Sequence, residues 1–129
     1  RIDLYNLHRH DPDVPLEESV GALEELQQAG KIRLIGLSNV SLGQLRQAQA
    51  VARIVSVQNE YNRGLLISDD VLDACEAEEI AFMPWRPLGE GLGDQVSELR
   101  WLLDRSPVIL PIPGTSSVAH LEANMRAVA

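Results

Sequence analysis

Apolar residues recur along the chain with two different periods, which alternate from one segment to the next. A period of two is typical of strands, and a period near 3.6 is typical of amphipathic helices. The strand pattern covers residues 2–7, 32–37, 54–58, 80–84 and 107–111. The helix pattern covers residues 16–26, 41–52, 68–79, 94–104 and 117–128. Strand and helix alternate throughout, so the sequence predicts five consecutive strand–helix units.

Residues suited to helix ends support these boundaries. Pro15 precedes the first helix, where a missing N–H costs nothing. Gly30 follows that helix at the position of a left-handed cap. Ser41 and Ser68 are expected to cap the next two helices with their hydroxyls.

Strict alternation predicts a parallel sheet with right-handed crossovers. Such a sheet is either closed as a barrel or open and doubly wound, and periodicity alone does not separate the two. In both, ligands gather beyond the C-terminal ends of the strands. The residues at those ends are polar or aromatic: His8-Arg9-His10-Asp11, Ser38-Asn39, Gln58-Asn59, Trp85-Arg86 and Gly114-Thr115-Ser116-Ser117.

Composition narrows the classes of function. The 129 residues fit one domain, and a net charge of −8 disfavours nucleic acid and anionic membrane as partners. One cysteine, Cys75, allows no internal disulfide and fits a reducing cytoplasm. His8 and His10 lie two residues apart with Asp11 beside them, but Asp11-Pro12-Asp13 is typical of a turn and no ligand elsewhere in the sequence completes a metal site, so we expect a surface loop there. The chain starts at Arg1 inside a strand pattern, which suggests truncation.

Five segments in order resemble signatures of the aldo-keto reductases: residues 3–8, 30–39, 57–62, 87–89 and 112–115. The resemblance implies a partial (β/α)8 TIM barrel over residues 1–129, with about five parallel βα units, the fourth to the eighth, and the first three absent. It also implies an oxidoreductase that transfers hydride between NADP(H) and the carbonyl group of an aldehyde or ketone.

The resemblance assigns roles to residues at the strand ends. His8 would donate a hydrogen bond to the carbonyl oxygen of the substrate, although a strand-end histidine with a structural role is the alternative. Ser38, Asn39 and Gln58 would hold the nicotinamide carboxamide, although Asn39 also suits the approach to a helix. Trp85 would stack on the nicotinamide, where the family more often has Tyr, or be a core aromatic instead.

The last loop and helix resemble the family's site for the adenosine 2′-phosphate. Gly114, Thr115 and Ser116 would surround the phosphate, while Ser116 and Ser117 also suit N-caps. Gly114 stands where the family commonly has Lys, and His120 where it commonly has Arg, which weakens the preference for NADP over NAD. Asn124 would face the adenine.

The family's catalytic Tyr, Lys and Asp have no counterparts in this sequence. Tyr5 lies inside a strand and Tyr61 after one, so neither replaces the acid. We therefore expect the chain alone to be inactive and its open barrel edges to favour self-association. The alternatives are a non-enzymatic remnant of a barrel and an open, flavodoxin-like binding domain.

Overall fold

The structure is a computed structural model that describes residues 1–91 and 93–128. Its centre is a parallel sheet in the order β1-β2-β3-β4. The strands are β1 (Ile2–Leu7), β2 (Ile32–Ser38), β3 (Ile54–Gln58) and β4 (Ala81–Phe82). The helices are α1 (Leu16–Gln28), α2 (Leu42–Gln49), α3 (Asp69–Ala77), α4 (Gln95–Arg105) and α5 (Val118–Met125).

Helix ends follow from local chemistry. After α1, Gly30 has φ 70°, and Lys31 N–H donates to the Leu26 carbonyl, so the predicted left-handed cap is confirmed. Ser41 caps α2 as predicted, and the structure adds that the cap is a reciprocal capping box with Gln44. The prediction for Ser68 is wrong. Its hydroxyl makes no cap and instead accepts a hydrogen bond from Asn59 Nδ2, at 3.2 Å, in the interior.

The fifth predicted strand, 107–111, is reduced to an isolated parallel bridge between Phe82 and Ile109. Three backbone hydrogen bonds still run between residues 82–84 and 108–112. The segment contains Pro107, Pro111 and Pro113, which have no N–H to donate, so a continuous ladder is interrupted. The fourth strand was predicted at 80–84, but in the structure it covers only Ala81–Phe82. It pairs with the interrupted segment on one side, and Pro84 ends the predicted range.

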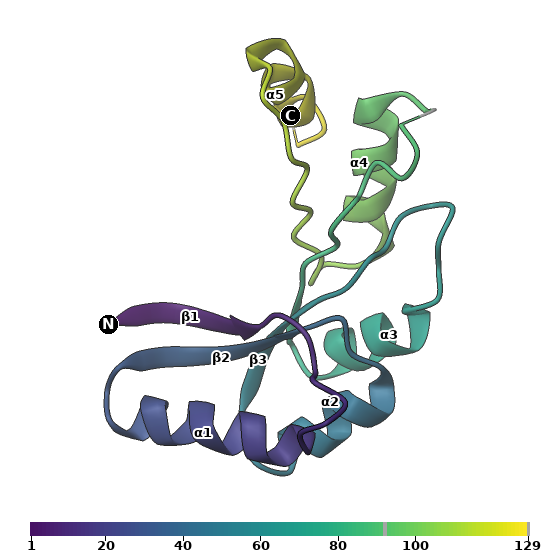
Figure 1. The fold of residues 1–129 in the computed structure, drawn as a ribbon. Helices are drawn as coiled ribbons and strands as arrows, with labels where there is room; N and C mark the ends of the chain where they lie inside the picture. The colour runs from purple at the N-terminus through teal and green to yellow at the C-terminus, as the bar shows by residue number, and fades with distance from the viewer. Residues whose placement is uncertain (92, 129) are drawn as a thin grey trace.

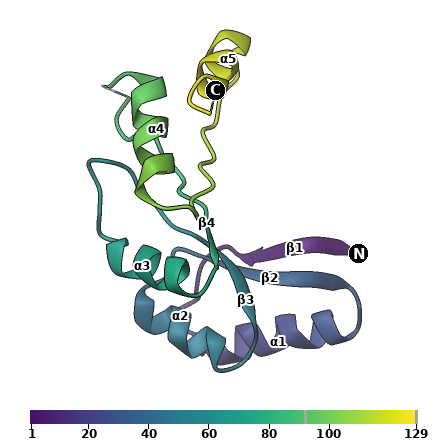
Figure 2. The same cartoon turned by 180° about the vertical axis from the view of Figure 1, so that it is seen from behind.

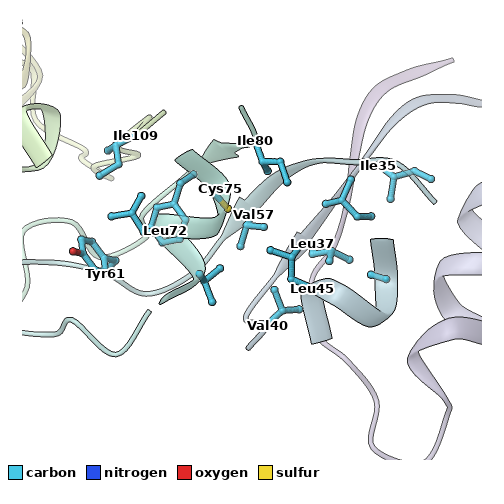
Figure 3. Packing of buried hydrophobic residues seen from close by; sticks show 14 of the residues in the cluster. Ile35, Leu37, Val40, Leu45, Val57, Tyr61, Leu72, Cys75, Ile80 and Ile109 are labelled. Atoms are coloured by element: carbon cyan, nitrogen blue, oxygen red, sulfur yellow. The ribbon is translucent and has the colours of Figure 1, made fainter. Parts of the chain in front are cut away.

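The first three helices lie on one side of the sheet. Figures 1 and 2 show α1, α2 and α3 along that side, while α4 and α5 lie together at the opposite end of the molecule. The core fills the space between helices and strands, with Ile35, Leu37 and Leu45 fully buried (Figure 3). No helix among the described residues has the length and apolarity that crossing a membrane requires.

The other face of the sheet is partly uncovered. Leu4 and Asn6 share a face of β1 because strand residues alternate, and Asn6 lies against the position of Gly36 on β2. A Cβ at Gly36 would come within 1.9 Å of Asn6 Oδ1 and 2.1 Å of Ser56 Oγ. These two atoms join in a 3.0 Å hydrogen bond from β3 to β1 that passes over Gly36.

Candidate functional site

The C-terminal ends of the four strands are joined by hydrogen bonds among side chains and backbone carbonyls. We call His8, Ser38, Asn39, Gln58 and Trp85 the strand-end cluster. The indole Nε1–H of Trp85 donates to Asn39 Oδ1 at 2.9 Å. Asn39 Nδ2 donates to the His8 carbonyl at 3.1 Å and to Ser38 Oγ at 3.0 Å. Residues that follow β1, β2 and β4 are thereby connected through one amide group.

Gln58 enters this group through its backbone. Its carbonyl accepts from Ser38 Oγ at 2.8 Å and from Asn39 N–H at 3.0 Å. Asn39 has φ 58°, in the left-handed region that asparagine tolerates better than most side chains. The chain therefore turns sharply after β2, and the Ser38 side chain is buried.

Two polar side chains in the cluster are left for a ligand. The His8 imidazole is exposed, the Gln58 amide is half-buried, and neither has a hydrogen-bond partner within the described residues. Asn39 Oδ1 accepts one hydrogen bond and has a second lone pair. The set offers donors at His8 and Gln58 and an acceptor at Asn39, which fits a primary amide beside a carbonyl group.

The predicted phosphate residues lie in a second group, at the start of α5, and the predicted adenine residue Asn124 lies near the end of the same helix. Thr115 Oγ1 accepts from Ser117 N–H at 3.1 Å, and Ser117 Oγ accepts from His120 N–H at 3.4 Å. Gly114 and Ser116 are exposed in the same loop. In the part of the chain that the structure describes, no hydrogen bond joins this group to the strand-end cluster, and α5 lies far from β1 (Figure 1).

Ser117 is the N-cap of α5, and this N-terminus has the features of an anion site, although a weak one. The first amides of a helix have no partner within it, so those of Val118 and Ala119 can bind an anion. No Lys or Arg occurs between residues 106 and 125. Asn124 is buried and accepts from Gln95 Nε2, which also donates to the His120 carbonyl at 2.9 Å. Asn124 therefore also connects α4 to α5.

A charged pocket of about 650 Å³ beside β4 was not anticipated. Arg86, which follows Trp85 and could have approached a phosphate, forms ion pairs there with Glu60 at 3.2 Å and Glu90 at 2.5 Å. Two carboxylates already neutralise its guanidinium, so Arg86 in this arrangement is poorly suited to bind an anion.

His10 has structural partners, as a loop residue would. Its Nε2 lies 2.9 Å from the Val14 carbonyl and its Nδ1 lies 3.3 Å from Gln44 Nε2. Since a carbonyl can only accept, Nε2 carries the proton and Nδ1 accepts from Gln44. The ring thus joins the loop after β1 to the first turn of α2.

Two groups with strongly raised pKa values lie outside the cluster. Burial, reinforced by a 2.6 Å hydrogen bond to Asp69, raises the pKa of Tyr61 to about 12. Burial also raises the pKa of the Cys75 thiol to about 12, with a smaller contribution from Glu78. Both groups stay protonated near neutral pH, so neither is suited to act as a base or a nucleophile.

Comparison with known sequences decides the family. The model of the Aldo/keto reductase family matches residues 1–98. This chain belongs to that family. An uncharacterized oxidoreductase of Schizosaccharomyces pombe is 41% identical, over 98% of this chain and 47% of its own length. Pyridoxine 4-dehydrogenase of Escherichia coli is 44% identical, over 98% of this chain and 52% of its own length.

A solved structure extends the comparison to the fold. The aldo/keto reductase from Klebsiella pneumoniae, in complex with NADP and acetate, is 28% identical with a TM-score of 0.83. The match covers 98% of this chain and 53% of that one. The aldo-keto reductase chain described here therefore spans about half the length of the relatives that it matches. Its parallel sheet is part of a (β/α)8 barrel wall, which confirms the predicted fold class.

Proposed function

We propose that this chain forms the fourth to eighth units of an NADP(H)-dependent reductase of aldehydes and ketones. The observation that carries the proposal is the strand-end cluster, in which the side chains of Ser38, Asn39 and Trp85 bond to one another and to the backbone carbonyls of His8 and Gln58. The NADP complex of the Klebsiella pneumoniae relative supports the choice of cofactor. When bound, NADPH supplies the hydride that reduces the carbonyl carbon.

The residues of the cluster have separate tasks in this proposal. Asn39 and Gln58 orient the carboxamide, with Ser38 supporting Asn39 from the interior. Trp85 offers a half-buried ring for stacking against the nicotinamide. His8 is the proposed catalytic residue. Its exposed N–H donates a hydrogen bond to the substrate oxygen as negative charge develops there.

The second group holds the other end of the cofactor. The α5 N-terminus, with Gly114, Thr115 and Ser116, faces the 2′-phosphate, and His120 adds a polar ring nearby. Asn124 approaches the adenine from the buried side of α5. Without Lys or Arg in this loop, the preference for NADPH over NADH is modest.

Catalysis needs more than this chain provides. The Tyr, Lys and Asp of the family have no counterparts in it, and acid–base groups contribute about 10²–10⁴-fold to rates. We propose that the 129 residues alone do not reduce carbonyl compounds.

The exposed edge of β1 suggests an additional property. β1 ends the sheet, and Ile2 and Leu4 on it are exposed. We propose that copies of this chain associate through this edge and the adjoining sheet face.

A fluorescence titration with NADPH, with NADH as comparison, tests the proposed function. We expect a micromolar dissociation constant for NADPH and a higher one for NADH. Gln58→Ala should weaken NADPH binding about fivefold, the cost of one hydrogen bond, because the half-buried amide faces the ligand. Gln47→Ala, on the exposed side of α2, is the matched control and should change nothing. Binding only in the millimolar range would refute the proposal.

A further inference from the structure

The sheet has two open edges, one at each end of the strand order. Within the part of the chain that the structure describes, β1 pairs with β2 alone, and residues 108–112 pair with residues 82–84 alone. Crossovers between parallel strands are right-handed, so each helix covers its own strand and the next one. α5 follows residues 108–112 and lies beside α4 (Figures 1 and 2). The place for a further strand next to α5 is therefore open.

Exposed apolar side chains occur at both edges on the same face of the sheet. The register runs from Leu7 on β1 across the sheet to Ile109, so these two residues share the face that the helices cover. Strand residues alternate between faces, which places Leu4 and Leu110 together on the other face. Both side chains are exposed, as are those of their face neighbours Ile2 and Ile112. The two edges therefore match in apolar character.

The backbone of β1 offers hydrogen-bond donors at its outer edge. Ile2 N–H donates inward to the Lys31 carbonyl at 2.9 Å. Successive residues of a strand in a parallel pair turn their backbone groups to opposite sides, so the N–H groups of Asp3 and Tyr5 point outward. This edge can donate hydrogen bonds to a neighbouring strand.

The edge at residues 108–112 is mainly an acceptor. Leu110 and Ile112 donate inward, to the carbonyls of residues 82 and 84. Of the outward residues, Ile109 donates its N–H to the Ser106 carbonyl, and Pro111 has no N–H. What remains is a row of carbonyl oxygens. Two such edges cannot pair with each other, but one can accept N–H groups from β1.

The helix side of the second edge is also apolar. A groove of about 410 Å³ lies between α4 and α5, and the exposed side chains of Leu121 and Met125 border it. Tyr5 lies two residues before Leu7, on the helix-covered face of β1, and is exposed at the edge. A β1 strand placed beside residues 108–112 would bring Tyr5 against α5.

The surface area of the chain exceeds that of a compact monomer of its mass. The accessible area is 7529 Å². A compact monomer of 14.2 kDa exposes about 6,800 Å². The excess is close to the ~800 Å² that each partner contributes to an interface of standard size. A second copy that covers the open edges would remove an excess of this size.

We infer that β1 of one copy lies parallel beside residues 108–112 of a second copy, with Tyr5 against α5 and Leu4 against Leu110. A two-fold axis along the strands makes this contact twice and keeps all strands parallel. Because the chain spans about half the length of its relatives, two copies are expected to close the ring. The inference rests on the proposed association between copies and does not depend on cofactor binding.

Mixed disulfides test which edges meet. One chain carries Leu4→Cys and the other Leu110→Cys, with Ile112→Cys as a second choice for a shifted register. The native thiol of Cys75 is fully buried and does not compete. Thiols held side by side have an effective concentration of about 1 mM, against micromolar for free chains, so the mixed disulfide should form roughly a hundredfold faster than random collision allows.

Leu66→Cys in place of Leu110→Cys is the matched control. Leu66 is exposed but precedes α3, away from both edges, so its mixed disulfide with Leu4→Cys should form at the slow rate of random collision. Fast disulfides between two copies of Leu4→Cys, with slow mixed ones, would overturn the inference and leave the association between copies standing.

Light scattering tests the closed ring without cysteine variants. The unaltered chain should have twice the 14.2 kDa mass of one copy, and Leu110→Lys should be a monomer. A Leu110→Lys variant that stays dimeric, or unaltered assemblies well above two copies, would overturn the inference. An unaltered monomer at micromolar concentration would overturn the association as well, and would assign both edges to strands of a longer protein.

Discussion

Gly36 lies beneath the hydrogen bond that runs from Ser56 on β3 to Asn6 on β1. Gly36→Ala would place a methyl group about 2 Å from both oxygen atoms, so the bond must break or the strands must separate. We expect the free energy of unfolding to fall by about 1–3 kcal/mol, the usual cost of overpacking.

Gly21→Ala provides the matched control for this substitution. Gly21 lies inside α1, and a Cβ there would meet nothing within 4 Å. Alanine is the better helix former, so this change should stabilise the chain by about 0.5–1 kcal/mol. Urea unfolding measures the free energy of unfolding of both variants. Equal changes in that free energy for Gly36→Ala and Gly21→Ala would contradict this account of Gly36.

At the same scale, the sequence predicted the members of the strand-end cluster but not their contacts. Ser38 and Asn39 follow one predicted strand and Gln58 ends the next, so their common location follows from parallel topology alone. The bond from Trp85 to Asn39 joins residues 46 positions apart, and no spacing in the sequence points to it. Arg86 is one of the polar residues at the strand ends, and only the fold brings Glu60 and Glu90 against it.

Among the elements, α3 and α4 are joined to the segment after β3 by a polar group around Tyr61. The Tyr61 hydroxyl donates to Asp69 on α3, and Arg105 at the end of α4 pairs with the same carboxylate at 3.2 Å. Tyr61 is fully buried, and its ring stacks on Trp101 of α4. These contacts attach α4 to α3 and to the segment that follows β3.

The raised pKa of Tyr61 makes this attachment depend on pH. Burial raises the pKa from 10.0 to about 12, so the folded chain holds the proton more tightly than the unfolded chain. The resulting stability is present below pH 10 and is lost as the pH rises from 10 through 12, by at most about 2–3 kcal/mol. Urea unfolding of the unaltered chain and Tyr61→Phe should therefore show a stability difference that shrinks over that range.

Tyr5→Phe is the control for this comparison, since Tyr5 is 40% exposed and lies on β1. Its stability should follow that of the unaltered chain at every pH. A constant difference between the unaltered chain and Tyr61→Phe from pH 9 to pH 12 would argue against coupling through the phenol proton.

Elements were easier to predict than their ends. The α4 pattern predicted 94–104 and the structure has Gln95–Arg105, because Asp94 caps the helix through Ser97 N–H at 2.8 Å. The prediction of a strand at 107–111 is wrong. Apolar alternation indicates which residues are buried, but it does not show whether the segment has enough N–H groups to pair with a neighbouring strand. The predicted end of α2 at residue 52 is also wrong, since the helix ends at Gln49. The pattern extended it because apolar residues in the turn that follows a helix have the same spacing as those inside it.

For the whole molecule, the uncovered sheet edge predicts association between copies. Leu4 lies on β1 and is 37% exposed, and Leu4→Lys should shift the mean mass toward that of a monomer. Leu66→Lys is the matched control, because Leu66 is 45% exposed but precedes α3, away from the edge. Light scattering at micromolar concentrations measures both, and a monodisperse unaltered monomer would refute the prediction.

Salt provides a second check on this association. Each copy carries a net charge of −8, so copies repel one another at low ionic strength. Raising the salt concentration should therefore increase the mean mass of the unaltered chain and change that of Leu4→Lys less. A mean mass that falls with salt would indicate ion pairs between copies in place of apolar contact.

The burial of Cys75 on α3 limits what such assemblies can become. It is the one thiol in the sequence, it is fully buried, and its pKa of about 12 keeps it in the unreactive form. Oxidising conditions therefore cannot cross-link folded copies. We therefore expect association between folded chains to be non-covalent and to reverse on dilution.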